Sequence, residues 1–168
     1  MKWYALFVET GREILVQKWI RYFFDKSDCY AVVPKRKLFE KKQGIKKQVI
    51  KIMFPGYVFI HTDMCIEVYY KLAAVPNIIK VLSNGSYWSY IDNNEIEPII
   101  KLIDENDIID YSKVLIENSN IFVKDGPLKG MEGIIKKIDK HRNRAKIELY
   151  LLGEPRLVDV GIEMIWAS

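Results

Sequence analysis

Cysteine is scarce in this chain, and this scarcity narrows the classes of protein to which it can belong. Among its 168 residues only Cys29 and Cys65 are cysteines, without the paired spacing of a zinc site or a disulfide framework. We therefore expect free thiols in a reducing compartment. The histidines, His61 and His141, have no cysteine or carboxylate pattern nearby that suits a metal. The sequence predicts no metal site and no cofactor.

Long apolar runs are also missing. No stretch approaches the length needed to cross a bilayer, and residues 2–8 already read as a strand, without a charged leader or a cleavage site. We expect a soluble, cytoplasmic protein. The composition also lacks the mark of disorder, because 49% of the residues are hydrophobic and 12% are aromatic.

The patterns that carry catalysis are absent as well. Gly126, Gly130 and Gly133 do not match a phosphate-binding P-loop, and no helix pattern follows them. No arrangement of Ser, Cys and His supports nucleophilic catalysis. The sequence therefore predicts a protein that is not an enzyme. Its net charge of +4 is compatible with nucleic acid, but the distribution of the charge matters more.

The most informative segment of the chain is residues 123–138. It reads as a strand, a glycine-rich turn and a second strand, and a polar, basic turn follows over residues 139–144. Ala145, Ile147 and Leu149 then alternate with polar residues, which is typical of a half-buried strand. So many short strands in so few residues predict a small barrel, since closure removes unpaired strand edges.

The N-terminal part alternates strand and helix patterns, which indicates an α+β fold. Thr10 and Glu13 have the spacing of a capping box, with Thr10 as N-cap, and predict a helix over residues 10–24. Acidic and polar residues then gather between positions 104 and 120. We expect an N-terminal domain at residues 1–106, a linker at 107–118 and a barrel domain at 119–168. Residues 114–116 have a second interpretation, as a first barrel strand.

A basic stretch follows the strand pattern at residues 30–33, and Gly44 at its middle suits a hairpin tip. The simplest interpretation is a solvated hairpin; the functional one is an arm that contacts phosphates of nucleic acid without reading their sequence. Its candidate residues are Lys35, Arg36, Lys37, Lys41, Lys42, Lys46 and Lys47.

Basic residues also recur through the predicted barrel. The turn at residues 140–144 is the sharpest candidate, because arginine and asparagine side chains can bond phosphates and base edges of RNA. A charged, solvent-facing hairpin is the alternative. The candidate nucleic-acid-binding residues of the barrel are Lys129, Lys136, Lys137, Lys140, His141, Arg142, Asn143, Arg144, Lys146 and Arg156.

Residues 122–148 resemble a KOW motif, and residues 2–11 and 54–60 resemble segments of an NGN domain. In this order, the three stretches resemble the NusG family of transcription elongation and antitermination factors. The resemblance implies an NGN domain with an antiparallel sheet and flanking helices, joined by a linker to an SH3-like five-stranded β-barrel. It also implies a monomer whose NGN domain binds the clamp helices of RNA polymerase. The residues carried over to that surface are Trp3, Tyr4, Phe54, Pro55 and Tyr57.

Within the family, residues 126–133 and the basic hairpin at 136–146 are most similar to the LoaP subgroup of specialised antiterminators. That similarity implies recognition of an RNA hairpin by the KOW domain. A housekeeping factor whose KOW domain contacts a ribosomal protein or a termination factor remains the alternative. A second alternative is a ribosome-associated structural protein. Non-template DNA is a further candidate partner of the basic residues.

Overall fold

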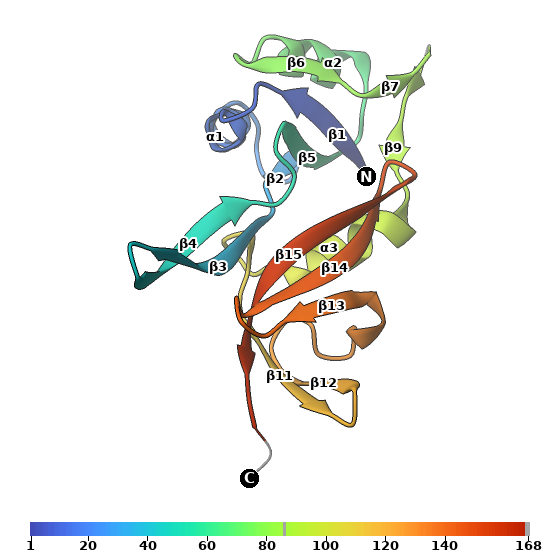
Figure 1. The fold of residues 1–168 in the computed structure, drawn as a ribbon. Helices are drawn as coiled ribbons and strands as arrows, with labels where there is room; N and C mark the ends of the chain where they lie inside the picture. The colour runs from blue at the N-terminus through green and yellow to red at the C-terminus, as the bar shows by residue number, and fades with distance from the viewer. Residues whose placement is uncertain (86, 167–168) are drawn as a thin grey trace. The chain divides into compact units, whose positions relative to one another are not determined.

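Residues 1–85 and 87–166 are described by the computed structural model; Ser86 and the end of the predicted barrel domain, Ala167 and Ser168, lie outside this part. The chain divides into two units (Figure 1). The first unit contains Met1–Val33 and Phe54–Ile96, and the second contains Pro34–Met53 and Glu97–Ser168. The basic stretch therefore groups with the C-terminal part of the chain rather than with the strands that flank it in sequence.

An antiparallel sheet forms the centre of the first unit. Its order is β2-β5-β1-β6, and β9 pairs with the beginning of β1. The apolar strands β1 and β5 lie in the middle of the sheet, where Leu6, Phe59 and Ile60 are fully buried. The strands are β1 (Lys2–Val8), β2 (Cys29–Val32), β5 (Tyr57–Thr62), β6 (Ile78–Val81) and β9 (Tyr90–Ile91).

Helices α1 (Glu13–Phe23) and α2 (Ile66–Ala73) belong to this unit, as the α+β prediction requires. Helix α3 (Asn93–Leu102) begins in the first unit and continues into the second, and β7 (Ser83–Asn84) pairs antiparallel with β8 (Tyr87–Trp88). Val16 and Ile20 bury one face of α1. Within residues 1–85 and 87–166, no helix has the length and apolar character needed to cross a membrane.

The predicted start of α1 is wrong. Arg12, not Thr10, is the N-cap, and it makes no side-chain capping bond. Glu13 is buried and accepts hydrogen bonds from the backbone N–H groups of Gly11, at 2.8 Å, and Gly56, at 3.2 Å. The carboxylate thus satisfies donors of the preceding turn and of a distant loop rather than closing a capping box. Sequence spacing cannot distinguish these roles, because the second donor is supplied by tertiary packing.

The second unit contains a long hairpin that we call the hairpin arm, made of β3 (Lys35–Lys42) and β4 (Ile45–Ile52). The strands pair antiparallel through eight residue pairs, and β10 (Ile108–Ile109) adds to β3 in parallel. The two tip residues, Gln43 and Gly44, have φ values of 53° and 77°. Positive φ at both positions matches the tight turns that join twisted strands, so the predicted hairpin tip at Gly44 is confirmed.

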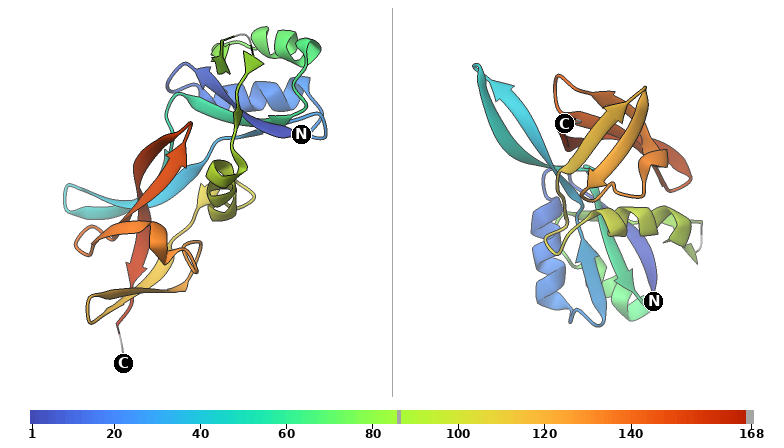
Figure 2. Two further views of the ribbon diagram at one scale, coloured as in Figure 1. Left: turned by 90° about the vertical axis from the view of Figure 1, so that its right-hand side faces the viewer. Right: turned by 90° about the horizontal axis from the view of Figure 1, so that it is seen from below.

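Five strands of the second unit form a curled sheet in the order β12-β11-β15-β14-β13 (Figures 1 and 2). This confirms the predicted α+β class with a C-terminal five-stranded, barrel-like sheet. Residues 114–116 lie in β11, so they form a strand of this sheet, as the second interpretation of that segment predicted. The strands are β11 (Ser112–Glu117), β12 (Asn120–Asp125), β13 (Ile135–Asp139), β14 (Arg144–Leu151) and β15 (Glu154–Met164).

The glycine-rich turn between β12 and β13 packs closely on β11. Gly126 has φ +104°, and a Cβ placed there would lie 2.6 Å from the Cα of Ser112. Leu128 in the same turn is fully buried, and its N–H donates to the Ser112 hydroxyl at 2.9 Å. Only glycine fits this approach. A short 3₁₀ helix, η1 (Glu132–Ile134), completes the connection to β13.

Candidate nucleic-acid interface

The hairpin arm packs against the C-terminal sheet of the same unit. Arg36 donates from Nη1 to the main-chain carbonyl of Asp159 at 2.7 Å, across 123 residues of sequence. The Lys37 ammonium pairs with the Asp110 carboxylate at 3.3 Å. Burial lowers the pKa of the Arg36 guanidinium, with the nearby Asp159 charge opposing that shift. These predicted arm residues therefore act at least in part as structural contacts.

A glycine in β15 permits this contact. A Cβ at Gly161 would overlap the Lys37 carbonyl oxygen and would lie 2.5 Å from the Tyr111 ring. Any larger side chain would push β3 away from β15. Glycine at position 161 is therefore needed for β3 of the arm to pack against β15 of the C-terminal sheet.

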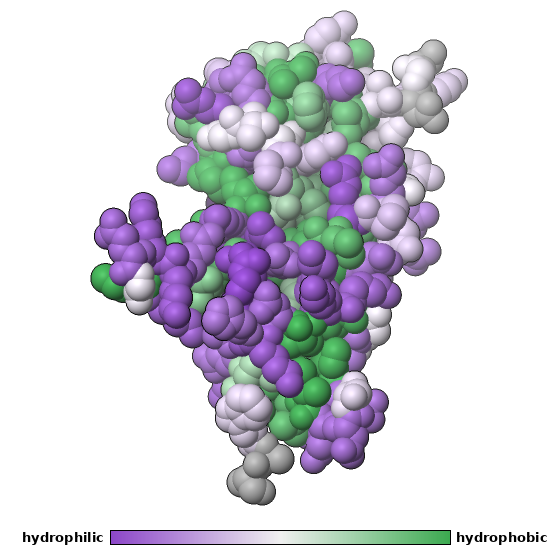
Figure 3. All heavy atoms as spheres, in the orientation of Figure 1, coloured by the Kyte–Doolittle hydropathy of each residue, from purple (hydrophilic) through white to green (hydrophobic). Residues whose placement is uncertain are grey.

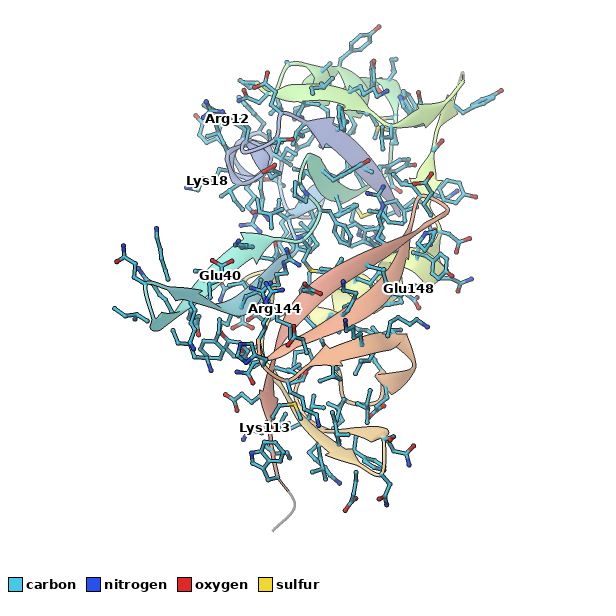
Figure 4. All side chains as sticks on the ribbon, in the orientation of Figure 1. Arg12, Lys18, Glu40, Lys113, Arg144 and Glu148 are labelled. Carbon is cyan, nitrogen blue, oxygen red and sulfur yellow. The ribbon has the colours of Figure 1, made fainter. Side chains whose placement is uncertain are left out.

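A cleft of about 630 Å³ lies between the arm and the turn that joins β13 to β14. We call it the hairpin–turn cleft. Figure 4 shows Glu40 of β3 and Arg144 of β14 beside each other in this region, and Figure 3 shows hydrophilic side chains covering the arm on this face. The cleft is lined by Phe39, Glu40, Lys41, Lys46, His141, Arg142, Asn143 and Arg144.

One carboxylate stands among the cations of the cleft. Glu40 pairs with Lys51 at 2.6 Å and lies 3.8 Å from the Arg144 guanidinium. The hydrogen bond from Lys51 is the main reason why the pKa of Glu40 falls below its usual value, and nearby arginines add to it. Arg144 is only 12% exposed and also lies 3.8 Å from Asp159. Glu40 thus stays ionised and helps to orient Arg144.

A second, smaller cavity of about 120 Å³ adjoins the same turn. Arg142 and Arg144 line both cavities, so they connect the two. The remaining residues of the second cavity are Lys137, Asp139, Lys146 and Asp159. The structure therefore places basic side chains of β13, β14 and their turn around two adjoining cavities.

The structure brings together only part of the predicted basic set. One cleft is lined by Lys41 and Lys46 of the arm and by His141, Arg142, Asn143 and Arg144 of the turn, which were predicted as two separate groups. Phe39 and Glu40 are cleft residues that were not predicted as site residues. The predicted residues that do not line either cavity are Lys35, Arg36, Lys37, Lys42, Lys47, Lys129, Lys136, Lys140 and Arg156.

The aromatic residues expected to bind a protein partner lie in the first unit on β1, on β5 and in the loop before β5. Trp3 stacks on His61 with ring centroids 4.8 Å apart, and Phe7 meets Tyr57 edge-on at 5.9 Å. Both are cross-strand pairs, so the four rings share one face of the sheet. All four are half-buried, and Pro55 is exposed. Phe7 and His61 were missed because strand pairing, not sequence proximity, adds them to this face.

Tyr4 and Phe54, two of the five residues carried over to the polymerase-binding surface, are not exposed beside Tyr57. Tyr4 is 7% exposed and Phe54 is 4% exposed, so both are core residues. Tyr4 pairs with Ile60 and therefore lies on the face opposite to Tyr57, because successive side chains of a strand alternate. Phe54 packs edge-on against Phe59 at 5.7 Å. Whether this region binds RNA polymerase stays a prediction.

Protein-family models match both the N-terminal and the C-terminal part of the chain. Residues 1–100 match the family model described as "Transcription termination factor nusG", and residues 117–148 match the KOW motif. The first match includes the face formed by β1 and β5, and the second includes the turn that lines the hairpin–turn cleft.

Individual relatives are similar over nearly their whole length. The transcription termination/antitermination protein NusG of Xylella fastidiosa is 25% identical, covering 99% of this chain and 99% of its own. The Rickettsia prowazekii protein of the same name is 23% identical over 99% of this chain and 90% of its own. The solved structure of Thermotoga maritima NusG covers 95% of this chain with a TM-score of 0.57 at 22% identity, which supports the fold.

Proposed function

The chain belongs to the NusG family of transcription termination and antitermination factors, and we propose that it acts as a processive antiterminator. Members of this family are transcription factors rather than enzymes. In the proposed mechanism, an NGN domain at residues 1–106 holds RNA polymerase and a KOW domain at 119–168 holds RNA. Residues 107–118, despite the strand within them, connect the two. The protein would work as a monomer in the bacterial cytoplasm.

The polymerase contact is assigned to the aromatic face of β1 and β5. Aromatic side chains dominate the binding energy of protein interfaces, and this face presents Trp3 and Tyr57 in half-buried positions with exposed Pro55 nearby. Such anchors suit the clamp helices of the polymerase. By binding the elongating conformation more tightly than the paused one, the protein would shift the population toward elongation. Tyr4 and Phe54 would support this face from the core.

The RNA contact is assigned to the basic turn of the C-terminal sheet. The single observation that carries it is the gathering of Arg142, Arg144 and neighbouring lysines around two adjoining cavities. Flexible cations neutralise phosphates, and arginine adds directional bonds to bases. We place the chain with the LoaP-like specialists that recognise an RNA hairpin. Non-template DNA remains a second candidate ligand of the exposed lysines.

Transcription in vitro tests this function. Purified bacterial RNA polymerase transcribes through an intrinsic terminator with and without the protein, on templates that carry or lack the structured leader of the neighbouring operon. We expect readthrough to rise only on the template with the leader.

The other outcomes separate the alternatives. An equal change in pausing or readthrough on both templates indicates a housekeeping factor whose KOW domain contacts a ribosomal protein or a termination factor. No change on either template, together with co-sedimentation with ribosomes, would favour a ribosome-associated structural protein and contradict the proposal.

A further inference from the structure

We propose that the hairpin–turn cleft binds one unpaired nucleotide of an RNA loop, jointly through the arm and the turn. The base would stack on Phe39, and the flanking phosphates would bind Lys41, Lys46 and Arg142. This inference rests on the proposed RNA binding by the second unit and extends it: the RNA site includes residues of the arm, about 100 positions earlier in sequence than the turn.

The size of the cleft fits such a ligand. Its volume of about 630 Å³ lies within the range of about 300–1,000 Å³ that is usual for small-molecule and cofactor sites. A duplex is too wide for a space of this volume, whereas an unpaired nucleotide turned out of a loop is not. RNA-binding proteins commonly take loop nucleotides in this way, because unstacked bases expose both their faces and their edges.

The cations of the cleft are available for phosphate. Within residues 1–85 and 87–166, neither Lys41, Lys46 nor Arg142 lies within ion-pairing distance of a carboxylate. Lys41 and Lys46 face each other across the two strands of the arm, so their like charges repel until an anion enters. Arg142 approaches from the turn, and its planar guanidinium can bind a phosphate through two parallel bonds.

Phe39 supplies the stacking surface. Its ring stacks on Tyr111, which does not line the cleft, and the ammonium of Lys46, which does line it, lies 4.3 Å from the Phe39 centroid. An exposed cation–π contact is weaker than the stacking of a base on an aromatic ring. Replacing Lys46 on the ring by a base therefore makes the free energy of RNA binding more favourable. The displaced Lys46 ammonium is then free to bind the phosphate.

The turn offers a partner for the edge of the base. Glu40 lies on the face of β3 opposite to Phe39 and Lys41, where its carboxylate is held by Lys51 and Arg144. Asn143 offers both a donor and an acceptor from the other wall of the cleft. The cleft therefore combines phosphate-binding cations, a flat ring and a base-edge partner in one place.

The test uses the full chain and fluorescence anisotropy. One probe is an RNA hairpin with an unpaired loop, and the other is a blunt RNA duplex with the same number of phosphates. We expect Phe39→Leu to weaken loop binding about 5- to 100-fold and to leave duplex binding unchanged, because only the loop can stack a base. Phe39→Trp should retain loop affinity, and its added fluorescence should be quenched by the loop RNA. Lys113→Ala, a lysine outside both cavities, is the charge control.

The possible failures can be told apart. If Arg142→Ala weakens loop binding but Phe39→Leu and Lys46→Ala do not, the joint site is wrong while RNA binding by the turn stands. If polyglutamate competes as well as the loop RNA, the assignment to an RNA nucleotide is wrong. If the parent chain binds neither RNA probe nor the structured leader, the proposed RNA binding fails together with this inference.

Discussion

Phe39 and Tyr111 stack with ring centroids 4.7 Å apart and ring planes 9° from parallel. Tyr111 also donates its hydroxyl to Oε1 of Gln48 on the second strand of the arm, at 3.3 Å. One residue at the entry to β11 therefore contacts both strands of the hairpin arm. This relationship fixes one wall of the hairpin–turn cleft relative to the C-terminal sheet.

Replacing Tyr111 should loosen the arm without unfolding the sheet. Tyr111→Leu removes the stacked pair, which is worth about 0.5–1.5 kcal/mol beyond its buried area. Tyr111→Phe keeps the ring and loses only an exposed hydrogen bond, so its free energy of unfolding should change little. Hydrogen exchange of the β3 and β4 amides measures the effect. Equal exchange in the Leu variant and the parent would show that the stack does not hold the arm.

Gly161→Ala should displace β3 from β15. The new methyl group would overlap the Lys37 carbonyl and the Tyr111 ring, and overpacking of this kind costs about 1–3 kcal/mol. Gly133→Ala is the matched control, because a Cβ there meets open space and its φ is not in the left-handed region. Urea unfolding compares the two variants. Equal stability of both variants and the parent would contradict the close packing of β3 against Gly161.

The two thiols should differ in reactivity. Burial raises the pKa of the Cys29 thiol from 9.0 to about 11, with the hydrogen bond to Thr62 opposing the shift, whereas Cys65 is exposed. At neutral pH a thiol reagent should label Cys65 and leave Cys29 unlabelled until urea unfolds the chain. Between pH 9 and 11 the unfolded thiol ionises before the folded one, so this group makes the folded state less stable as pH rises. Labelling of both thiols in the native state would contradict the burial of Cys29.

The aromatic face of β1 and β5, proposed to bind RNA polymerase, can be tested without disturbing the core. Trp3→Ala with Tyr57→Ala should weaken binding to RNA polymerase by about 30-fold or more, the scale of an interface hot spot. Tyr22→Ala removes a 78%-exposed aromatic ring of α1 and serves as the control. Phe54→Ala is unsuitable because truncating a buried phenylalanine costs about 3–5 kcal/mol of stability. Unchanged affinity of a folded double variant would place the polymerase contact elsewhere.

Local sequence patterns predicted the parts of the fold that depend on neighbouring residues. The alternation after residue 144 gave β14, and Gly44 gave the tip of the arm. The start of α1 was missed because Glu13 bonds to Gly56, a partner 43 residues away. Tyr4 and Phe54, which the resemblance carried over to the polymerase-binding surface, are buried in the core, because the face of a strand that a residue occupies depends on pairing and packing.

The candidate site could be predicted only in pieces. The sequence marked Lys46 and Arg142 as basic candidates in separate segments, but no local pattern brings them to one cleft. Their proximity depends on contacts such as Arg36 with Asp159 and on the absence of a side chain at Gly161. Phe39 carried no signal of its own, because an aromatic residue in a strand is usually a packing residue.

Terminator readthrough by a cleft variant tests the central claim most directly. Lys46→Ala with Arg142→Ala is compared with the parent chain on templates with and without the structured leader, while affinity for RNA polymerase is measured in parallel. We expect the leader-dependent readthrough to be lost and the affinity for RNA polymerase to be unchanged. Full readthrough by the variant on the leader template would contradict it, because RNA recognition by the second unit would then play no part in antitermination.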